Sequence, residues 1–209
     1  MNLQPNIPKP SRNEVEKYLL KWRQLEKYYN QERALNKLFF DLCPKNDDIE
    51  DILLKCSTLN AFYTTNIFDI NAIANHILSL EIDERLEKGD LSLVEDIAKV
   101  KVGNPPKEHN FYSFATKYCS HHKPHLYSIY DYYVEKVLIH FKNETMQLHN
   151  FTQADLKHYP TFIMVIHDFQ KCYNLESYNL HKVRNRVFPS FYFHLCHCKF
   201  FHQFYQFEI

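Results

Sequence analysis

Glycine is almost absent from this chain, since Gly89 and Gly103 are the only two glycines among 209 residues. Dinucleotide-binding loops, P-loops and nucleophile elbows each need several glycines close together, so all three classes of site are excluded. An excess of one charge is also lacking, because 25 Lys and Arg residues balance 25 Asp and Glu residues. No global electrostatic attraction to nucleic acid or membrane therefore exists, and an anionic partner has to be held by a local patch.

A cysteine framework and long apolar runs are missing as well. The six cysteines are scattered, which predicts reduced thiols rather than a disulfide scaffold. The first residues, MNLQPNIPKPSRNEVEKY, carry no apolar stretch of the kind found in signal peptides. No uncharged apolar run approaches the roughly 20 residues that a membrane span needs. We therefore expect a cytoplasmic protein with no membrane partner, and its 45% of hydrophobic residues predict a sizeable core.

Signals for helices run through most of the chain. Ser11 and Glu14 form a capping box, and apolar residues recur at helical spacing from there towards Pro44. Proline and glycine forbid a helix at residues 101–110, and strand signals are weak and isolated. The sequence predicts an all-α fold, arranged as two lobes with a cleft near Gly103. The further helices expected after Pro44 cover 48–62, a segment capped by Asn66 or Asp69, 91–100, 111–118, 130–141 and 153–172.

The chain divides by composition into an extended segment at 1–10, a single helical domain at 11–188 and an aromatic tail at 189–209. The tail is rich in phenylalanine and carries only two formal charges. Three interpretations of it stay open: a buried terminal element, an interaction surface, or sequence whose composition was never shaped by folding. Its run His194-x-Cys196-His197-Cys198 is too tight for a tetrahedral zinc site and has no partner motif, so no metal is expected.

A basic stretch lies in the middle of the chain. Between residues 99 and 125, five lysines stand against one acidic residue, and four histidines are able to add charge. Such a local excess is what phosphate binding needs on a chain of zero net charge, and the alternative is a solvated basic face. The candidate contacts to a DNA backbone are Lys101, Gly103, Lys107, His109, Ser113, His121, His122 and Lys123.

A resemblance to a known superfamily lies in the same region. Ser113-Phe-Ala-Thr-Lys117, then Pro124, then Tyr127-Ser-Ile-Tyr-Asp131-Tyr-Tyr-Val134 resembles the core of helix-hairpin-helix base-excision DNA glycosylases. More closely, it is similar to 8-oxoguanine-glycosylase-like bacterial proteins. Asp131 matches the superfamily's aspartate at the head of a helix, and Lys117 matches its lysine. The hairpin departs from the usual Leu-Pro-Gly-x-Gly turn, because the equivalent Val102-Gly-Asn-Pro-Pro106 has a single glycine.

The resemblance implies a helix-hairpin-helix fold and a DNA glycosylase that removes a damaged base, such as an oxidised purine, from double-stranded DNA with that base flipped out. Asp131 would stabilise the sugar cation, and Lys117 would attack C1′ and form a Schiff base, which adds lyase activity. Asn60 would fill the gap left by the flipped base. The resemblance implies no cofactor, and we expect a monomer associated with the nucleoid.

Other interpretations of these residues stay open. Asp131 is equally suited to cap its helix, and Lys117 to lie exposed on a helix surface. His121 and His122 are expected to face solvent or touch phosphate rather than to act in catalysis, and Asn60 fits a helix end. Two other function classes also remain: a non-catalytic DNA-binding or defence-associated module on the same scaffold, and a helical protein-interaction protein.

Overall fold

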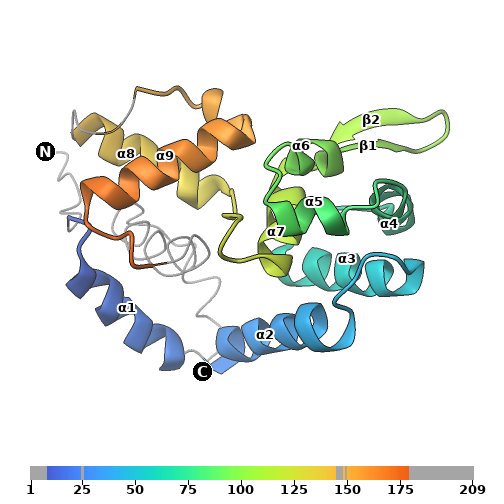
Figure 1. Ribbon diagram of the computed structural model, residues 1–209, viewed down its shortest axis with the longest axis horizontal. Helices are drawn as coiled ribbons and strands as arrows, with labels where there is room; N and C mark the ends of the chain where they lie inside the picture. The colour runs from blue at the N-terminus through green and yellow to red at the C-terminus, as the bar shows by residue number, and fades with distance from the viewer. Residues whose placement is uncertain (1–8, 25, 145–147, 149, 179–209) are drawn as a thin grey trace, which may run out of the picture.

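The computed structural model describes residues 9–24, 26–144, 148 and 150–178, and these residues are mostly helical (Figure 1). The expected helices are found, although the one predicted over 153–172 begins only at Tyr159 and the segment predicted over 91–100 is helical only from Leu93 to Ala98. The elements are α1 (Arg12–Gln24), α2 (Glu26–Asn36), the π-helix η1 (Lys37–Leu42), α3 (Ile49–Tyr63), α4 (Ile70–Ser79), α5 (Asp83–Lys88), α6 (Leu93–Ala98), β1 (Lys99–Val102), β2 (Lys107–Asn110), α7 (Tyr112–His122), α8 (Tyr132–Glu144), the 3₁₀ helix η2 (Asp155–Lys157) and α9 (Tyr159–Cys172).

Several helices begin where a polar side chain caps them. The backbone N–H of Glu14 donates to Ser11 Oγ over 3.3 Å, as the predicted capping box requires. Asp48 accepts hydrogen bonds from the first turn of α3, and Asp69 accepts one from Ala72 at the start of α4. Asp69, not Asn66, is therefore the cap of α4. Each cap satisfies backbone donors that a helix start leaves without an intrahelical partner.

The prediction of an all-α fold needs a correction, because β1 and β2 form a two-stranded antiparallel sheet between α6 and α7. Lys99 pairs with Asn110 and Val102 with Lys107 in this hairpin. The sequence signal was the alternation Lys-Val-Lys-Val in β1, which places Val100 in the core and its lysines in solvent. The turn at Gly103 was predicted, whereas its flanking strands were not.

The elements form two groups joined by the segment between α7 and α8 (Figure 1). Helices α3 to α7 lie together on one side, and α8 and α9 lie on the other, where the rings of Phe141 and Phe169 pack at 5.8 Å. One continuous core runs through both groups, from Val15 to Leu175. The predicted domain at 11–188 remains a prediction, and residues 1–8 and the tail at 189–209 lie outside the described residues.

Hydrogen bonds to α9 and η2 hold the two groups together. The hydroxyl of Tyr159 accepts from the backbone N–H of Ser128 and donates to its carbonyl, at 2.8 and 2.9 Å. Tyr112 Oη donates to the carbonyl of Leu156 over 3.1 Å. The segment between α7 and α8 is thereby fixed, and with it the start of α8, where Asp131 lies.

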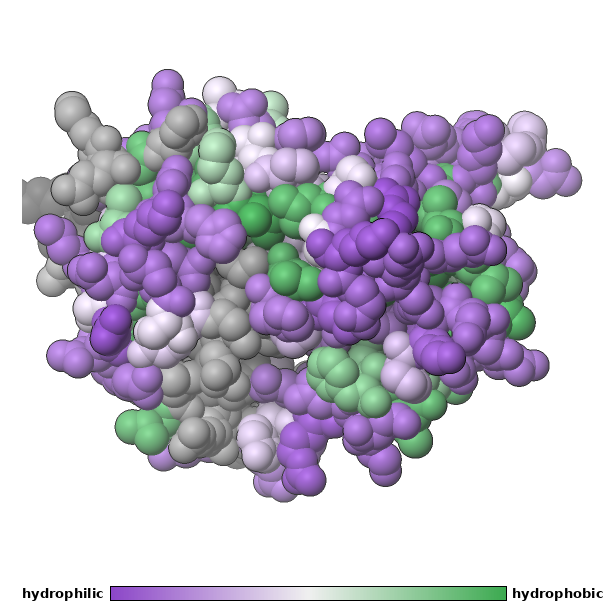
Figure 2. Space-filling view, viewed as in Figure 1, coloured by the Kyte–Doolittle hydropathy of each residue, from purple (hydrophilic) through white to green (hydrophobic). Residues whose placement is uncertain are grey.

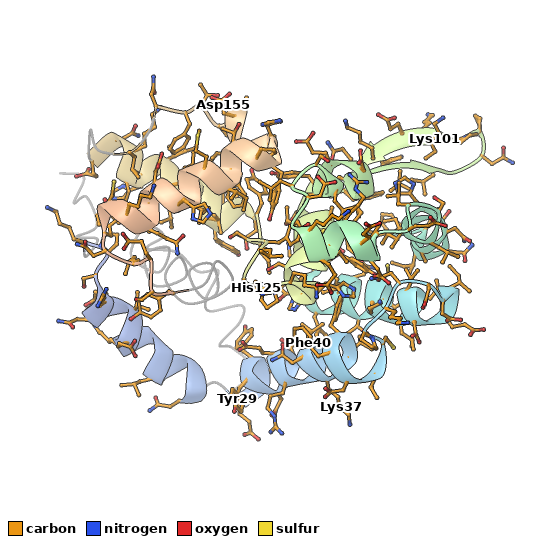
Figure 3. The ribbon with its side chains drawn as sticks, viewed as in Figure 1. Tyr29, Lys37, Phe40, Lys101, His125 and Asp155 are labelled. Carbon is orange, nitrogen blue, oxygen red and sulfur yellow. The ribbon has the colours of Figure 1, made fainter. Side chains whose placement is uncertain are left out.

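The surface seen in Figure 2 is mainly hydrophilic, with a few apolar patches. One of them lies over α2 and η1, where Phe40 and Leu42 are exposed (Figure 3). No helix among the described residues is both long enough and apolar enough to cross a membrane.

Candidate active site

Helix α7 holds Lys117 inside the protein, so the alternative of an exposed helix lysine is wrong. Only 4% of the residue's surface is exposed. Its Nζ donates to Ser113 Oγ over 2.5 Å and to the Ser113 carbonyl over 3.1 Å, one helical turn earlier. The same Nζ lies 5.3 Å from the centre of the Tyr63 ring, at the end of α3. A buried cation is thus held by hydrogen bonds and by the face of an aromatic ring.

Asp131 is the N-cap of α8. Its Oδ1 accepts hydrogen bonds from the backbone N–H groups of Tyr133 and Val134, at 3.0 and 2.9 Å. Free amides and the positive end of the helix dipole favour an ionised carboxylate at this position. The capping role that the sequence allowed is therefore found, and it leaves the carboxylate charged at the head of the helix.

Ser113 connects the lysine to the segment that carries the aspartate. Its Oγ accepts from Lys117 Nζ and donates to the carbonyl of Tyr130 over 3.1 Å. Thr116 Oγ1 also accepts from the backbone N–H of Tyr130, at 3.1 Å. Because Tyr130 directly precedes Asp131, α7 fixes the backbone at the head of α8 through these bonds. The fold thus brings Lys117 and Asp131, which are 14 residues apart, into one neighbourhood.

His121 lies close to Lys117, because both side chains contact Tyr63. Its Nε2 lies 2.9 Å from Tyr63 Oη, and its ring packs 5.4 Å from that of Phe39. With 4% of its surface exposed, His121 does not face solvent, which corrects the expectation for this residue. A contact from His121 to a DNA backbone would require the surrounding side chains to move.

His122 is also buried, and it belongs to a polar network that sequence reasoning missed. Lys55 is fully buried in α3; its Nζ donates to Asn46 Oδ1 over 2.7 Å and lies 3.4 Å from His122 Nε2. Tyr118 Oη donates to the same Asn46 oxygen, and Asn46 Nδ2 donates to Asp83. Enclosed in this way, His122 does not face solvent, which corrects that expectation, and a contact with a DNA phosphate would require the network to open.

Burial changes the proton affinity of this network. It lowers the pKa of Lys55 to about 8, although the Asp83 carboxylate acts in the opposite direction. Burial, together with the nearby Lys55 charge, lowers the pKa of His122 well below its ordinary value. The only sequence signal for this network was a lysine among the inward-facing positions of α3.

The remaining predicted DNA contacts lie in two places. Lys101, Gly103, Lys107 and His109 are exposed on the hairpin, where Figure 3 labels Lys101. Lys123, just after α7, forms an ion pair with Glu87. Its charge is therefore partly neutralised within the protein. Of the basic candidates, the hairpin residues alone combine exposure with no ion pair among the described residues.

Asn60 is committed to the loop that follows α3. Its side chain accepts hydrogen bonds from the backbone N–H of Ile67 and the hydroxyl of Thr65, and it donates to the carbonyl of Ile67. Thr64 and Asn66 in this loop have left-handed backbone conformations, with φ of 49° and 56°. The amide therefore shapes the loop, and it would have to give up these bonds to enter a DNA helix.

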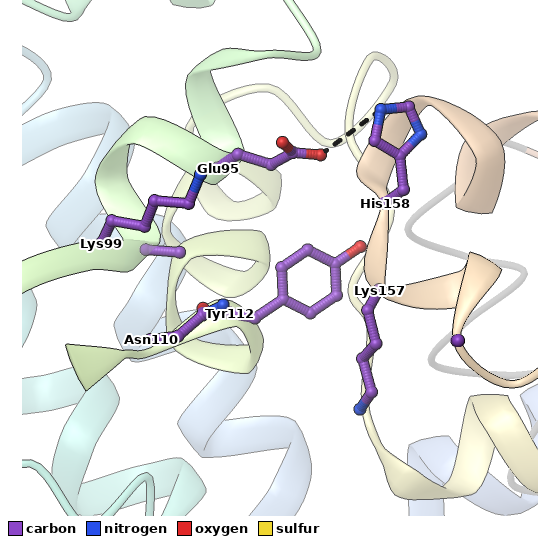
Figure 4. A pocket seen from close by; sticks show the side chains of 8 residues that line it. Glu95, Lys99, Asn110, Tyr112, Lys157 and His158 are labelled. Atoms are coloured by element: carbon purple, nitrogen blue, oxygen red, sulfur yellow. Dashed lines mark ion pairs between the residues drawn. The ribbon is translucent and has the colours of Figure 1, made fainter. Parts of the chain in front are cut away.

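A pocket of about 280 Å³ lies between the two groups of helices (Figure 4). Glu95 Oε1 accepts from the backbone N–H of Tyr159, at the start of α9, and lies 3.8 Å from His158 Nε2. The ring of Tyr112 lies between the residues that the two groups contribute. The amine of Lys157 turns away from this ion pair, to a position 4.4 Å from the Tyr130 ring. The pocket's polar groups therefore do not converge on one point.

Metal ligands do not gather in the part of the chain that the structure describes. No group of three or more His, Cys, Asp or Glu side chains is placed there to hold an ion. The run from His194 to Cys198 lies outside the described residues. Cys119, which follows Lys117 by two residues on α7, is buried, and its burial raises the pKa of the thiol. A thiolate nucleophile at this position is disfavoured.

A family model matches more than half of the chain. The family is HI_0787_N, described as an N-terminal domain, and its match covers residues 14–126. The chain belongs to this family. An uncharacterized protein of Haemophilus influenzae (strain ATCC 51907 / DSM 11121 / KW20 / Rd) is 46% identical over 145 residues, which are 68% of this chain and 70% of that protein. No solved structure matches the chain.

The HI_0787_N match divides the candidate site. It includes the buried Lys55 network, Ser113, Lys117 and the whole β1–β2 hairpin. It ends at residue 126, before Asp131 and α8. The lysine thus lies within the matched N-terminal domain, and the aspartate follows just beyond it.

Proposed function

We propose that this HI_0787_N protein is a DNA glycosylase of base-excision repair, with Lys117 as nucleophile and Asp131 as the stabilising carboxylate. The observation that carries the proposal is the link from Lys117 Nζ through Ser113 to the residue before Asp131. An amine and a carboxylate in one neighbourhood are the two groups that this chemistry needs. The resemblance of residues 113–134 to helix-hairpin-helix glycosylases supports the same activity, and an oxidised purine is the proposed target.

In the proposed reaction, a damaged nucleotide leaves the base stack, because its C1′ is unreachable inside a duplex. The amine of Lys117 first gives up a proton and then attacks C1′. The bond from C1′ to the base breaks, and the base leaves with the electron pair and takes up a proton. Opening of the sugar ring then moves a proton to O4′ and leaves an imine between Nζ and C1′. Asp131 stabilises the positive charge that develops on the sugar.

Burial of Lys117 fits this role in one specific way. Only 4% of the residue is exposed, so an intact duplex has no route to the amine. A sugar extruded from the duplex would reach the amine by displacing the side chains that surround Lys117. The hydrogen bond to Ser113 holds the amine at a defined position before that happens. Holding reacting groups in position is a major part of enzymatic rate enhancement.

A second candidate is a non-catalytic DNA-binding or defence-associated module on the same scaffold. The burial of Lys117 and the helix cap formed by Asp131 favour it. Both residues have structural roles that would account for their positions without catalysis. A third possibility, a protein-interaction protein, would retain no DNA.

Borohydride trapping separates these functions. Wild-type protein, Lys117→Ala, Asp131→Asn and the control Lys171→Ala, which removes an exposed lysine of α9, are incubated with duplexes carrying 8-oxoguanine, uracil or an abasic site. We expect a covalent adduct with wild type and the control, and none with Lys117→Ala. Peptide mass spectrometry should place the adduct on Lys117.

The alternatives have distinct signatures in the same experiment. No adduct and no strand cleavage on any lesion, with salt-sensitive DNA binding intact, would assign the protein to the binding module. Absence of DNA binding altogether would favour the protein-interaction function. An adduct that survives Lys117→Ala would contradict the assignment of the nucleophile.

A further inference from the structure

The β1–β2 hairpin projects from the helical body as a ribbon. Figure 1 shows it extending beyond α6 and α7, and the label of Lys101 in Figure 3 lies on it. Its root is fixed, because the backbone N–H of Phe111 donates to the carbonyl of Ala98 over 2.8 Å and Val100 is buried. The ribbon therefore has a defined orientation relative to α7, the helix that carries Lys117.

Polar side chains cover the ribbon, and the ring of His109 stacks on that of Phe111 at 5.7 Å. All four residues of β2 are exposed, as are Lys99 and Lys101 of β1. Three lysines stand against one acid, Glu108, which faces Lys101 across the two strands without forming an ion pair with it. Among the described residues, no side chain of the ribbon's lysines, Glu108 or Asn110 has a hydrogen-bond or ion-pair partner.

Strand geometry sorts these side chains into two faces. Partners in an antiparallel pair point to the same side, and neighbours along a strand point to opposite sides. Lys99, Lys101, Glu108 and Asn110 therefore share one face, as their pairing shows. Val100 lies on the other face, which turns towards the core. At the root of the face that carries the lysines of β1, Lys99 and Asn110 line the pocket between the two groups of helices (Figure 4), and Lys101 and Glu108 are exposed nearer the turn.

We propose that this ribbon enters a groove of double-stranded DNA. Four residues per strand give it a length of about 13 Å at roughly 3.3 Å per residue, and its two strands lie about 4.8 Å apart. The major groove, about 12 Å wide and 8.5 Å deep, admits a two-stranded ribbon. Lysine donates to phosphates and to the O6 and N7 atoms of guanine, and asparagine pairs with the edge of adenine. The exposed side chains of Lys99, Lys101 and Asn110 offer these groups on one face of the ribbon.

The inference rests on the proposed function for its partner, since DNA is the substrate of that activity. It adds a second contact region, formed by a β-ribbon in place of the helical hairpin that the resemblance implies. Gly103, in its turn, has φ of +88°, which favours glycine over residues with a side chain. Glycine here serves the turn of the ribbon, which is a different role from the phosphate contact expected from the sequence.

Fluorescence anisotropy with a labelled 20-base-pair duplex tests the charge contribution. Lys99→Gln/Lys101→Gln, which removes both lysines from one face of the ribbon, is compared with wild type and with Lys27→Gln/Lys171→Gln, a control that removes the same charge from exposed positions of α2 and α9. Each lysine that contacts DNA contributes roughly 0.9 to the slope of log K against log salt. We expect the slope of the ribbon variant to fall by about 2 and that of the control to stay unchanged.

Dimethyl sulfate footprinting tests the groove itself, because the reagent methylates guanine N7 in the major groove. Wild-type protein should protect guanines at its site, and Lys99→Gln/Lys101→Gln should lose that protection. A wild-type slope for the ribbon variant, or binding without any protected guanine, would overturn the proposal. Binding to no duplex at all would overturn it too, and the ribbon would then be tested against an acidic protein partner.

Failure of the ribbon proposal is distinguishable from failure of the proposed function. DNA binding that depends on the ribbon lysines, without a trapped adduct, would leave the ribbon in place and reject the glycosylase. An adduct on Lys117, together with DNA binding that does not depend on the ribbon lysines, would support the glycosylase and reject the ribbon proposal.

Discussion

Ser113 Oγ accepts a hydrogen bond from Lys117 Nζ at 2.5 Å and donates one to the carbonyl of Tyr130 at 3.1 Å. This hydroxyl contacts both the buried amine and the residue before Asp131. It therefore couples the position of the amine to the start of α8. The sequence interpretation of Ser113 was a DNA contact, and the structure gives it a positioning role within the protein.

Ser113→Ala is expected to reduce the rate of adduct formation more than DNA affinity, because the amine loses its fixed position while the exposed basic surface is unchanged. The free energy of unfolding should fall by about 1–3 kcal/mol, since a charged donor loses one of its acceptors in a buried setting. Single-turnover trapping on an abasic duplex gives the rate, and urea unfolding gives the stability. Ser57→Ala, on the exposed side of α3, is the matched control and should leave both unchanged. Equal losses of rate and affinity would contradict the positioning role.

Substitutions of Asp131 separate its cap from its charge. Asp131→Ala should cost about 1 kcal/mol of stability, because the N–H groups of Tyr133 and Val134 lose their acceptor. Asp131→Asn should retain most of the stability, since asparagine caps helices about as well as aspartate. It should nevertheless slow adduct formation by roughly 10²-fold or more, because the neutral amide no longer stabilises a sugar cation.

The control for Asp131 is Asp69→Asn, which makes the same chemical change at the cap of α4. It should preserve stability and adduct formation alike. Thermal unfolding and trapping of the three variants side by side check these expectations. If Asp131→Asn traps DNA as fast as wild type, Asp131 is a structural cap only.

The local signals in the sequence predicted most of the helices, and they did so for physical reasons. Ser11 and Asp69 cap helices because a short polar side chain at those positions satisfies free backbone N–H groups. The ribbon was missed because its strands have only four residues each, so the alternation of Lys and Val is too brief to stand out. Charge alone marked Lys101 and Lys107 as exposed, which they are.

Burial of polar residues was the part that the sequence did not reveal. His121 and His122 were expected to face solvent or phosphate, because their partners come from distant parts of the chain. Tyr63 is 58 residues from His121, and Lys55 is 67 residues from His122. Helical periodicity describes a single element, and no local pattern encodes a contact of that range.

Lys55→Met tests the buried network at alkaline pH. The pKa of Lys55 is lowered to about 8 in the folded protein, so between pH 8 and about 10.5 the unfolded chain binds more protons. Its titration therefore makes wild-type stability rise with pH in that window. The variant lacks the group, so the stability difference, wild type minus variant, should grow between pH 8 and 10. At pH 7.5 the variant should already be less stable by about 1–3 kcal/mol, because the carbonyl of Lys45 loses its donor.

Urea unfolding at pH 7.5, 8.5 and 9.5 measures this difference. The tyrosines and cysteines of the core titrate in both proteins, so their effects cancel in the comparison. Lys27→Met, an exposed lysine of α2, is the control and should show a constant difference across the same range. A constant difference for Lys55→Met would mean that the lysine keeps its ordinary pKa inside the protein.

His122→Gln tests the same network at acidic pH. The pKa of His122 is lowered well below its ordinary value by burial, so the unfolded chain binds the extra proton as pH falls below about 6.5. Wild-type stability should consequently fall between pH 6.5 and 5. Glutamine keeps a polar group near Lys55 but does not titrate, so the variant should lose less stability over that range. Denaturant unfolding at pH 7.5, 6 and 5 gives the two curves, with His125→Gln as an exposed control. Parallel curves for wild type and His122→Gln would show that this histidine does not contribute to acid unfolding. The loss of stability at low pH would then come from another buried group. His140 would be substituted next, because burial lowers its pKa as well.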